Sequence, residues 1–357
     1  MFAERLVRAR KAAGLSMKAL AEQVGVSANA IKKYEHGVNM PSSTNLLALA
    51  KALEVRTEYF FRSVKVELER VEYRKRANTS KKLLGQINGD VMDQAERWAE
   101  LLDIYPDSIK PVPTFALPDC LPELIATPTE IEIVADVMRG KWALGLNPIP
   151  NMVDILESKG VMIISTSVEA KKKFDGLAGN IGNTPVVVVS THQPGDRQRF
   201  TLAHELGHLV LHDRLPESMD EEKACNHFAG AFLFPKYALI QRMGANRQAI
   251  ESQELYMLKH EFGISMMAVF MRAEQCGVIS ESLKKQYFMR FSQLGWRTKE
   301  PWKAYRNEDT YLFTQLVYRA LAEEYIGESK AAELIGTSLS VFHKERKLGV
   351  IGATVNQ

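Results

Sequence analysis

The sequence His204-Glu205-Leu206-Gly207-His208 lies inside a stretch whose apolar residues recur at helical spacing. Residues four apart lie on one face of an α-helix, so the two imidazoles can reach a single metal ion. Glu205 lies about 100° round the helix from His204 and can reach a water molecule on that metal without binding the metal itself. The opposite side carries the side chains that we expect to be buried, which are Leu202, Leu206, Leu209 and Val210.

A β-branched run precedes this helix. Residues 185–190 read PVVVVS, a composition typical of a buried strand. The alternative to a metal site is a surface helix with two solvated histidines, and the apolar surroundings of the motif argue against it. We therefore expect a metal-binding helix that follows a buried strand.

A catalytic zinc site needs a third protein ligand beside the two histidines. His212 lies about 12 Å along the helix axis from His204, which is too far for one ion to bind both. The next expected helix, residues 221–235, offers Glu222, with Asn226 four residues later on the same face. We predict Glu222 as the third ligand and Asn226 as the amide that orients a ligating histidine. Three neighbouring side chains remain alternatives to Glu222, namely Asp220, Glu221 and His227.

The stretch RFTLAHELGH, followed by E-x-x-x-N-x-F-A over residues 222–229 and by Pro235, resembles the ImmA/IrrE-type zinc metallopeptidase domain. The upstream residues 175–178, DGLA, agree with this resemblance. The resemblance implies a bound Zn²⁺ held by the two motif histidines and by the carboxylate of the second helix. One departure is Cys225, where alanine is usual; it should still pack as a small apolar residue.

Carried onto this sequence, the resemblance assigns His204, His208 and Glu222 as zinc ligands and Glu205 as the catalytic general base. An enzyme of this kind hydrolyses peptide bonds. We therefore expect a zinc metallopeptidase domain.

Short amphipathic helices fill the first sixty residues. We predict helices over residues 2–13, 17–24, 28–35 and 44–53, with Ser16 and Ser27 as N-caps. Gly25 lies in the turn between the second and third helices. Two short helices joined by a glycine-containing turn are typical of a helix-turn-helix.

Residues 16–37 resemble the Xre/Cro-type, lambda-repressor-like family. The resemblance implies that the third helix enters the major groove of double-stranded DNA. A small protein-interaction domain is the alternative. Met17 stands where the family commonly has Gln, which removes a polar contact to the DNA backbone. Repressors of this type bind two half-sites, so we also expect a homodimer. The expected DNA contacts are Lys18, Ser27, Ala28, Asn29, Lys32 and Lys33.

The charge distribution agrees with an anionic partner for the N-terminal part. The chain of 357 residues has a net charge of +3, whereas residues 1–85 carry 17 Lys and Arg against 8 Asp and Glu. The remainder is therefore net acidic. Three scattered cysteines do not make a disulfide framework, and neither a signal peptide nor a membrane-length apolar run is visible. We expect a cytoplasmic protein that does not contact membranes.

We expect a mainly α protein with an all-α helix-turn-helix domain and a small α+β zincin-like domain, whose sheet edge could accept an extended peptide. Residues 64–82 and 86–105 are expected to be helical. Near the end, residues 331–338 repeat the spacing of residues 20–27, and we expect a plain helical hairpin there rather than a second helix-turn-helix. The predicted parts are a helix-turn-helix domain at 1–62, a helical and Pro-rich linker at 63–127, a zincin-like metallopeptidase domain at 128–300 and a C-terminal helical segment at 301–357.

These features predict a DNA-binding transcriptional regulator with a zinc-dependent peptidase domain. Relatives of this architecture occur in phage, mobile-element and toxin–antitoxin settings, and stand-alone relatives cleave a repressor. The resemblance thus implies cleavage of a partner repressor, or of the chain itself, in response to a signal. The alternative is a non-catalytic repressor or antitoxin whose zinc domain binds a toxin partner or senses a ligand; the intact Glu205 favours the enzyme.

Overall fold

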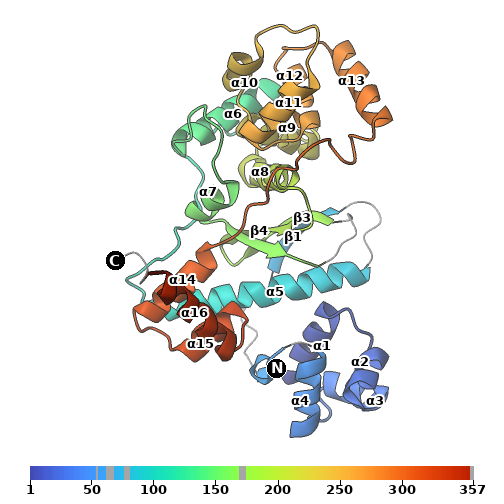
Figure 1. Ribbon diagram of the computed structural model, residues 1–357, viewed down its shortest axis with the longest axis vertical. Helices are drawn as coiled ribbons and strands as arrows, with labels where there is room; N and C mark the ends of the chain where they lie inside the picture. Colours follow the sequence, from blue (N-terminus) through green and yellow to red (C-terminus); the bar gives the residue numbers. More distant parts are fainter. Residues whose placement is uncertain (54, 62–67, 76–80, 169–173, 354–357) are drawn as a thin grey trace.

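The computed structural model describes residues 1–53, 55–61, 68–75, 81–168 and 174–353. Helices dominate, and a small sheet lies between two groups of them (Figure 1). One group lies above the sheet in this view, the other lies below it, and the N-terminal helices form a separate bundle under α5. Within the described ranges, every helix falls short of the length or the hydropathy that a membrane span requires.

The N-terminal bundle forms as the sequence predicts. Ser16 and Ser27 cap the second and third helices, each accepting a hydrogen bond of 3.1 Å from the backbone N–H three residues later. Gly25 turns the chain between them at φ +76°, a left-handed conformation that glycine adopts without strain. The elements are α1 (Phe2–Ala12), α2 (Met17–Val24), α3 (Ala28–Glu35), α4 (Ser43–Ala52) and the 3₁₀ turn η1 (Thr57–Phe61).

A four-stranded sheet crosses the middle of the molecule in the order β1-β3-β4-β2. Strand β4 pairs in parallel with β2 and antiparallel with β3, and β3 pairs antiparallel with β1. Alternate residues of β4 enter different cores, Val187 and Val189 on one face and Val186 and Val188 on the other. Burial on both faces explains the continuous valine run. The strands are β1 (Leu68–Lys75), β2 (Met162–Thr166), β3 (Phe174–Ile181) and β4 (Thr184–Ser190).

The larger core lies on the face of the sheet that carries the motif helix. The motif helix α8 packs on the sheet, and α9 packs on α8. At the start of α6, Thr127 and Glu130 form a capping box, with Pro128 in the first turn. The helices of this group are α6 (Pro128–Lys141), α7 (Met152–Ser158), α8 (Gly195–Leu211), α9 (Glu221–Leu233), α10 (Lys236–Met243), α11 (Ser252–Phe262), α12 (Met266–Gln275) and α13 (Glu281–Gln293).

The second core lies on the opposite face of the sheet. Helix α5 (Lys81–Ile104) runs beneath the strands (Figure 1), and its Trp98 ring lies 5.1 Å from the ring of Phe313. This core draws residues from 87–105, from the strands and from 316–342, so it is shared by three of the predicted parts of the chain. The C-terminal helices are α14 (Leu312–Ala322), α15 (Glu328–Ile335) and α16 (Leu339–Ala353).

Two expectations from the sequence differ from the structure. Residues 68–75 form strand β1, where a helix over 64–82 was expected; residues 64–67 and 76–80 lie outside the described residues. Strand β3 was not assigned at all. Strands β1 and β3 form backbone hydrogen bonds with each other. This long-range pairing overrides the local helical periodicity of the sequence. The second expected helix of the linker is present as α5 and begins at Lys81 rather than at residue 86.

An ion-pair cluster joins the N-terminal bundle to the rest of the protein. Arg5 on α1 forms a buried ion pair with Glu96 on α5, and Arg8 donates to the same carboxylate at 2.8 Å. Because the positive charges of Arg5 and Arg8 both pair with the buried Glu96 carboxylate, they hold α1 against α5. Burial raises the pKa of Glu96, while its hydrogen bond with Arg5 and the charges of Arg5 and Arg8 lower it; the first effect is the larger.

A second buried network holds α8 in place. Arg199 on α8 pairs with Glu308, which belongs to the segment 294–311 that joins α13 to α14. The same carboxylate accepts hydrogen bonds from the backbone N–H groups of Met152 at 2.7 Å and Val153 at 3.1 Å, at the start of α7. The side chain of Gln198 donates to the Glu308 carbonyl at 2.9 Å and accepts from its N–H at 2.8 Å. One glutamate thus connects α7, α8 and the C-terminal connection.

We expect Glu308→Ala to lower the free energy of unfolding by about 3–5 kcal/mol, because it leaves the Arg199 charge buried without a partner. Urea unfolding followed by circular dichroism measures the change. The matched control is Glu281→Gln, which breaks an exposed ion pair of 2.9 Å with Lys285 and should leave the midpoint unchanged. Equal midpoints for the two variants would show that the buried pair does not stabilise the fold.

Candidate functional site

Helices α8 and α9 bring the predicted metal ligands together. The Nε2 atoms of His204 and His208 lie 3.1 Å apart. The Glu222 carboxylate reaches both rings, with Oε2 at 3.4 Å from Nε2 of His204 and Oε1 at 3.5 Å from Nε2 of His208. His204 is fully buried, whereas Glu222 is 65% exposed, so the site opens on the α9 side.

These distances fit a zinc ion. The ligand atoms of a tetrahedral zinc with bonds of about 2.0–2.1 Å lie about 3.3–3.4 Å from one another. Two imidazoles and one carboxylate are also a donor set that zinc accepts, and they leave a fourth position for water or substrate. The residues present therefore fit the metal that the motif implies.

A second ligand set overlaps with the first. Among the residues that the structure describes, potential ligand atoms approach within 4.8 Å of one another in two groups of three: His204, His208 and Glu222, and His208, Glu221 and Cys225. Glu221 lies 3.0 Å from Nδ1 of His208, on the side of the ring away from His204. It is thus placed to orient that ring rather than to share a metal with both histidines.

The predicted orienting amide lies where such a residue should be. Oδ1 of Asn226 is 3.1 Å from Nδ1 of His204, so an N–H on that nitrogen can donate to the amide oxygen. In that neutral tautomer Nε2 carries no proton and can bind a metal on the side that faces Glu222. Each histidine of the motif therefore has one polar neighbour on α9 that fixes its ring.

Glu205 lies between α8 and the sheet and is 2% exposed. Strand β3 approaches it at Gly176, where a Cβ atom would lie 3.9 Å from Oε1 of Glu205 and 2.6 Å from Cγ2 of Thr201. A side chain at residue 176 would therefore push β3 away from α8. This requirement accounts for the glycine in the sequence DGLA, which the sequence pattern alone did not explain.

Gly207, inside the motif, sets the spacing of the two ligand-bearing helices. A Cβ atom there would lie 3.2 Å from Cα of Cys225 and 3.3 Å from its Cβ. Cys225 is fully buried at this contact and packs as a small apolar residue. Larger residues at either position would separate α8 from α9 and withdraw Glu222 from the histidines. Sequence reasoning missed this role of Gly207, although a glycine inside an apolar helix was the available signal.

The remaining alternatives do not reach the two histidines. His212 lies at the C-terminal end of α8, where its Nε2 is 3.5 Å from Asp213. Asp220 caps α9 by accepting from the Lys223 N–H at 3.1 Å. His227 points away from the site and lies 2.6 Å from Glu132. Burial raises the pKa of Glu132, but hydrogen bonds from Arg272 and His227 and their charges outweigh it and lower this pKa to about 2.

The edge of the sheet beside the site is already occupied. Strand β3 pairs with β4 on one side and with β1 on the other, and Arg74 of β1 is opposite Gly176. An extended peptide could add to β3 only where β1 now lies. The outer strand at the other end of the sheet is β2.

The N-terminal bundle presents the expected residues to solvent. Ile31 and Tyr34 of α3 are buried, and Asn45 donates to the Tyr34 hydroxyl at 3.3 Å. The opposite face of α3 is therefore open to a partner. All six predicted DNA contacts are exposed, namely Lys18, Ser27, Ala28, Asn29, Lys32 and Lys33.

Comparison with known proteins agrees with this reading of both regions. A family model described as "Helix-turn-helix" matches residues 6–60, and one described as "IrrE N-terminal-like domain" matches residues 156–274. The cryptic phage CTXphi transcriptional repressor RstR of Vibrio cholerae serotype O1 is 40% identical over 52 residues, 15% of this chain and 46% of that protein. An uncharacterized transcriptional regulator in the ATPase CF(0) region of Rhodospirillum rubrum is 43% identical over 58 residues, 16% of this chain and 54% of that protein.

The chain thus spans about half the length of these curated relatives. Among solved structures, ComR from Streptococcus suis covers 97% of this chain and 93% of its own, at 13% identity and a TM-score of 0.16, which supports no argument about the fold. The two family models each identify one domain of the chain. The chain joins an N-terminal helix-turn-helix domain of the Xre type to an IrrE N-terminal-like domain of the M78 peptidase type.

Proposed function

We propose that this protein is a DNA-binding transcriptional regulator whose IrrE N-terminal-like domain is a zinc-dependent peptidase that cleaves a partner repressor or its own chain. One observation carries the enzymatic part: three zinc-type donors converge within 3.5 Å of one another, with the buried Glu205 one residue from His204. A site that only binds metal has no need of this carboxylate.

In this proposal His204, His208 and Glu222 hold the ion. A bound zinc would supply Lewis acidity toward a peptide carbonyl and lower the pKa of water. Glu205 would accept the proton of the attacking water on a carboxylate oxygen and pass it to the leaving nitrogen of the peptide. Asn226 and Glu221 keep the two imidazoles in their productive orientations.

The DNA-binding part rests on α3. Its exposed face carries an amide and two lysines, at Asn29, Lys32 and Lys33. Asn can pair with adenine through two hydrogen bonds, and Lys can contact guanine or phosphate. Because repressors of this kind read two half-sites about 34–36 Å apart, we propose that the protein acts as a homodimer on a nearly palindromic operator.

Strand β1 supports a second candidate function. It occupies the edge of β3 at Gly176, where an extended substrate would add. A zinc domain whose peptide-binding edge is filled by its own chain could serve in a non-catalytic repressor or antitoxin, which binds a toxin partner or senses a ligand. Activity of the purified protein separates the two candidates.

The first test concerns the metal. We expect zinc to be lost from a His204→Ala, His208→Ala double variant, because both ring ligands are removed. Glu222→Gln should lower the affinity more than Glu221→Gln, because only Glu222 reaches Nε2 of both histidines. Competition titration with a zinc chelator measures this order. The reverse order would assign Glu221 as the ligand, and full occupancy in the double variant would place the metal elsewhere.

The second test concerns Glu205. We expect Glu205→Gln to keep zinc and the fold and to slow peptide cleavage by about 10²–10⁴-fold, the typical contribution of a general base. The zinc-loaded protein is incubated with the products of its genomic neighbours, and fragments are identified by mass spectrometry. Glu217→Gln, an exposed change between α8 and α9, is the control. Equal cleavage by Glu205→Gln and the control, or none by the unaltered protein, would favour the non-catalytic candidate.

The third test concerns DNA. In the full chain, Asn29→Ala should cost about 1–3 kcal/mol and relax specificity at one base pair, as expected for a residue that reads a base edge. Lys33→Ala should weaken binding to all sequences and reduce the slope of log K against log salt concentration by about one. Footprinting and salt titrations report these changes. Lys51→Ala, exposed on α4, serves as the charge control, and an effect as large as that of Lys33→Ala would contradict the role of α3.

A further inference from the structure

The turn between α15 and α16 has the geometry of the turn in the N-terminal helix-turn-helix. Helix α15, like α2, has eight residues and ends at a left-handed glycine: Gly336 has φ +80°, and Gly25 after α2 has φ +76°. Ser338 then accepts a hydrogen bond of 3.3 Å from the Val341 N–H, and Ser27 makes the equivalent bond at the start of α3. The sequence favoured a plain helical hairpin here, whereas the structure has the turn and the cap of a helix-turn-helix.

The C-terminal unit, which comprises α14, α15 and α16, buries side chains at the same positions relative to the turn glycine as the N-terminal unit does. Each of these side chains is at most 2% exposed; they are Leu20, Ala21 and Ile31 in one unit and Ala331, Ala332 and Phe342 in the other. Tyr318 of α14 stacks on Phe342 with ring centroids 5.7 Å apart, so α14 supplies the first helix of the unit. Glu328 at the start of α15 pairs with Arg346 and, at 2.7 Å, with His343, which holds α15 against α16.

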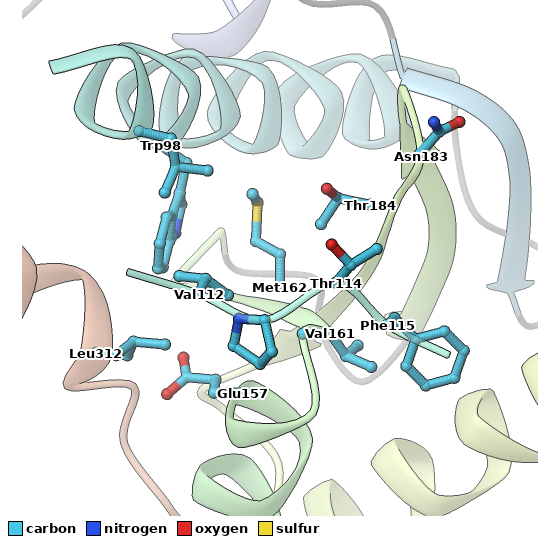
Figure 2. A pocket seen from close by; sticks show the side chains of 13 residues that line it. Trp98, Val112, Thr114, Phe115, Glu157, Val161, Met162, Asn183, Thr184 and Leu312 are labelled. Carbon is cyan, nitrogen blue, oxygen red and sulfur yellow. The ribbon is translucent and has the colours of Figure 1, made fainter. Parts of the chain in front are cut away.

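Helix α5 supports the C-terminal unit from one side (Figure 1). Leu312 at the start of α14 and Trp98 of α5 line the same cavity (Figure 2). Arg97 of α5 donates to the Leu334 carbonyl at 3.1 Å, and a Cβ atom at Gly336 would lie 2.9 Å from Nη1 of this arginine. Contacts this close leave the turn little freedom to move relative to α5.

The face of α16 opposite Phe342 is polar and positively charged. Ser340, Lys344 and Lys347 are all exposed and lie about 140–160° round the helix from Phe342. Among the described side chains of α16, the ion pairs to Glu328 are made by His343 and Arg346, on other sides of the helix. The one acidic residue in the sequence of α16 lies about 100° round from Lys344, outside this face. The two lysines therefore present their charge to an outside partner.

The residues on this face match the expected reading positions of α3. Counted from the turn glycine, Ser340 stands where α3 has Asn29, and Lys344 stands where α3 has Lys33. A hydroxyl group can bond to base edges, and Lys can contact guanine or phosphate. Val341, 44% exposed, stands beside them in the position of Ala30, and its methyl groups can contact the methyl group of thymine.

We propose that the C-terminal unit is a second helix-turn-helix and that α16 enters the major groove of double-stranded DNA, with Ser340 toward the bases and with Lys344 and Lys347 on guanine or phosphate. Interfaces between proteins are depleted of charged residues at their centre, whereas this face has Lys344 at its centre. Anionic DNA fits that charge. The proposal goes beyond the role of α3 and requires neither zinc nor peptidase activity.

The proposal is tested with the full-length protein and a random-sequence duplex of about 20 base pairs, which spans one or two half-sites. Fluorescence anisotropy at low salt measures binding in a Lys32→Glu, Lys33→Glu background, where α3 repels phosphate. We expect this protein still to bind the duplex. Adding Lys344→Glu and Lys347→Glu should lower the remaining affinity by about tenfold or more and reduce the slope of log K against log salt concentration by about two.

The matched control reverses two other exposed lysines, Lys299 and Lys303, in the connection between α13 and α14. Lys299→Glu with Lys303→Glu should leave the remaining affinity nearly unchanged, and circular dichroism checks the fold of each variant. An equal loss in both pairs, or no binding by the Lys32→Glu, Lys33→Glu background, would overturn the proposal. Neither result bears on the role of α3, which the Asn29→Ala variant tests separately.

Photochemical crosslinking identifies what α16 contacts. A benzophenone maleimide is attached at Ser340→Cys, in the same α3 background with Cys120→Ser; Cys225 and Cys276 are buried and should not react. Irradiation with the duplex should attach DNA to this position. The control is the same background labelled at its native, exposed Cys120, which should give little DNA adduct. Equal DNA adducts from the two positions, or crosslinks from position 340 only to a second copy of the chain, would contradict the proposal.

Discussion

A buried ion pair between Arg199 and Glu308 anchors the helix that carries the two motif histidines. A guanidinium group in the interior is tolerated only if a carboxylate and further acceptors surround it. Glu308 meets this need, and the Ile149 carbonyl accepts a second hydrogen bond from Arg199 at 2.8 Å. The pairing fixes the first half of α8 against α7 and against the segment that leads to α14. The first half of α8 is therefore held in position, and this fixes where the second half places His204 and His208.

Two glycines determine how closely other elements approach helix α8. Gly207 allows α9 to lie against α8, and Gly176 allows β3 to lie against the same helix near Glu205. The three side chains of the metal site come from two helices, so their separation depends on helix packing more than on any single rotamer. Neither glycine belongs to the ligand set, yet each determines whether that set can form. Close packing of this kind leaves little freedom for a larger residue.

The sequence predicts those parts whose signals are local. The two capped helices around Gly25, the strand expected at residues 185–190 and the motif helix are all present, because caps, turns and periodicity lie within a few residues of one another. Strand β1 and the Arg199–Glu308 pair were not expected, because each depends on partners about 100 to 110 residues away along the chain. The predicted choice of Glu222 over Glu221 stays open to experiment: helical spacing places both near the histidines, and only the distances distinguish their positions.

The position of Glu308 has a consequence for how this protein can be divided. A fragment that stops at residue 300 would contain all three metal ligands but would leave Arg199 as an uncompensated cation inside α8. A protease cut between residues 300 and 308 would have a related effect, since only noncovalent contacts would then hold Glu308 in place. The shortest segment that keeps α8 intact is therefore longer than the segment that contains the metal ligands. Recombination that exchanges the C-terminal helices must keep Glu308 together with α8, because Glu308 neutralises Arg199.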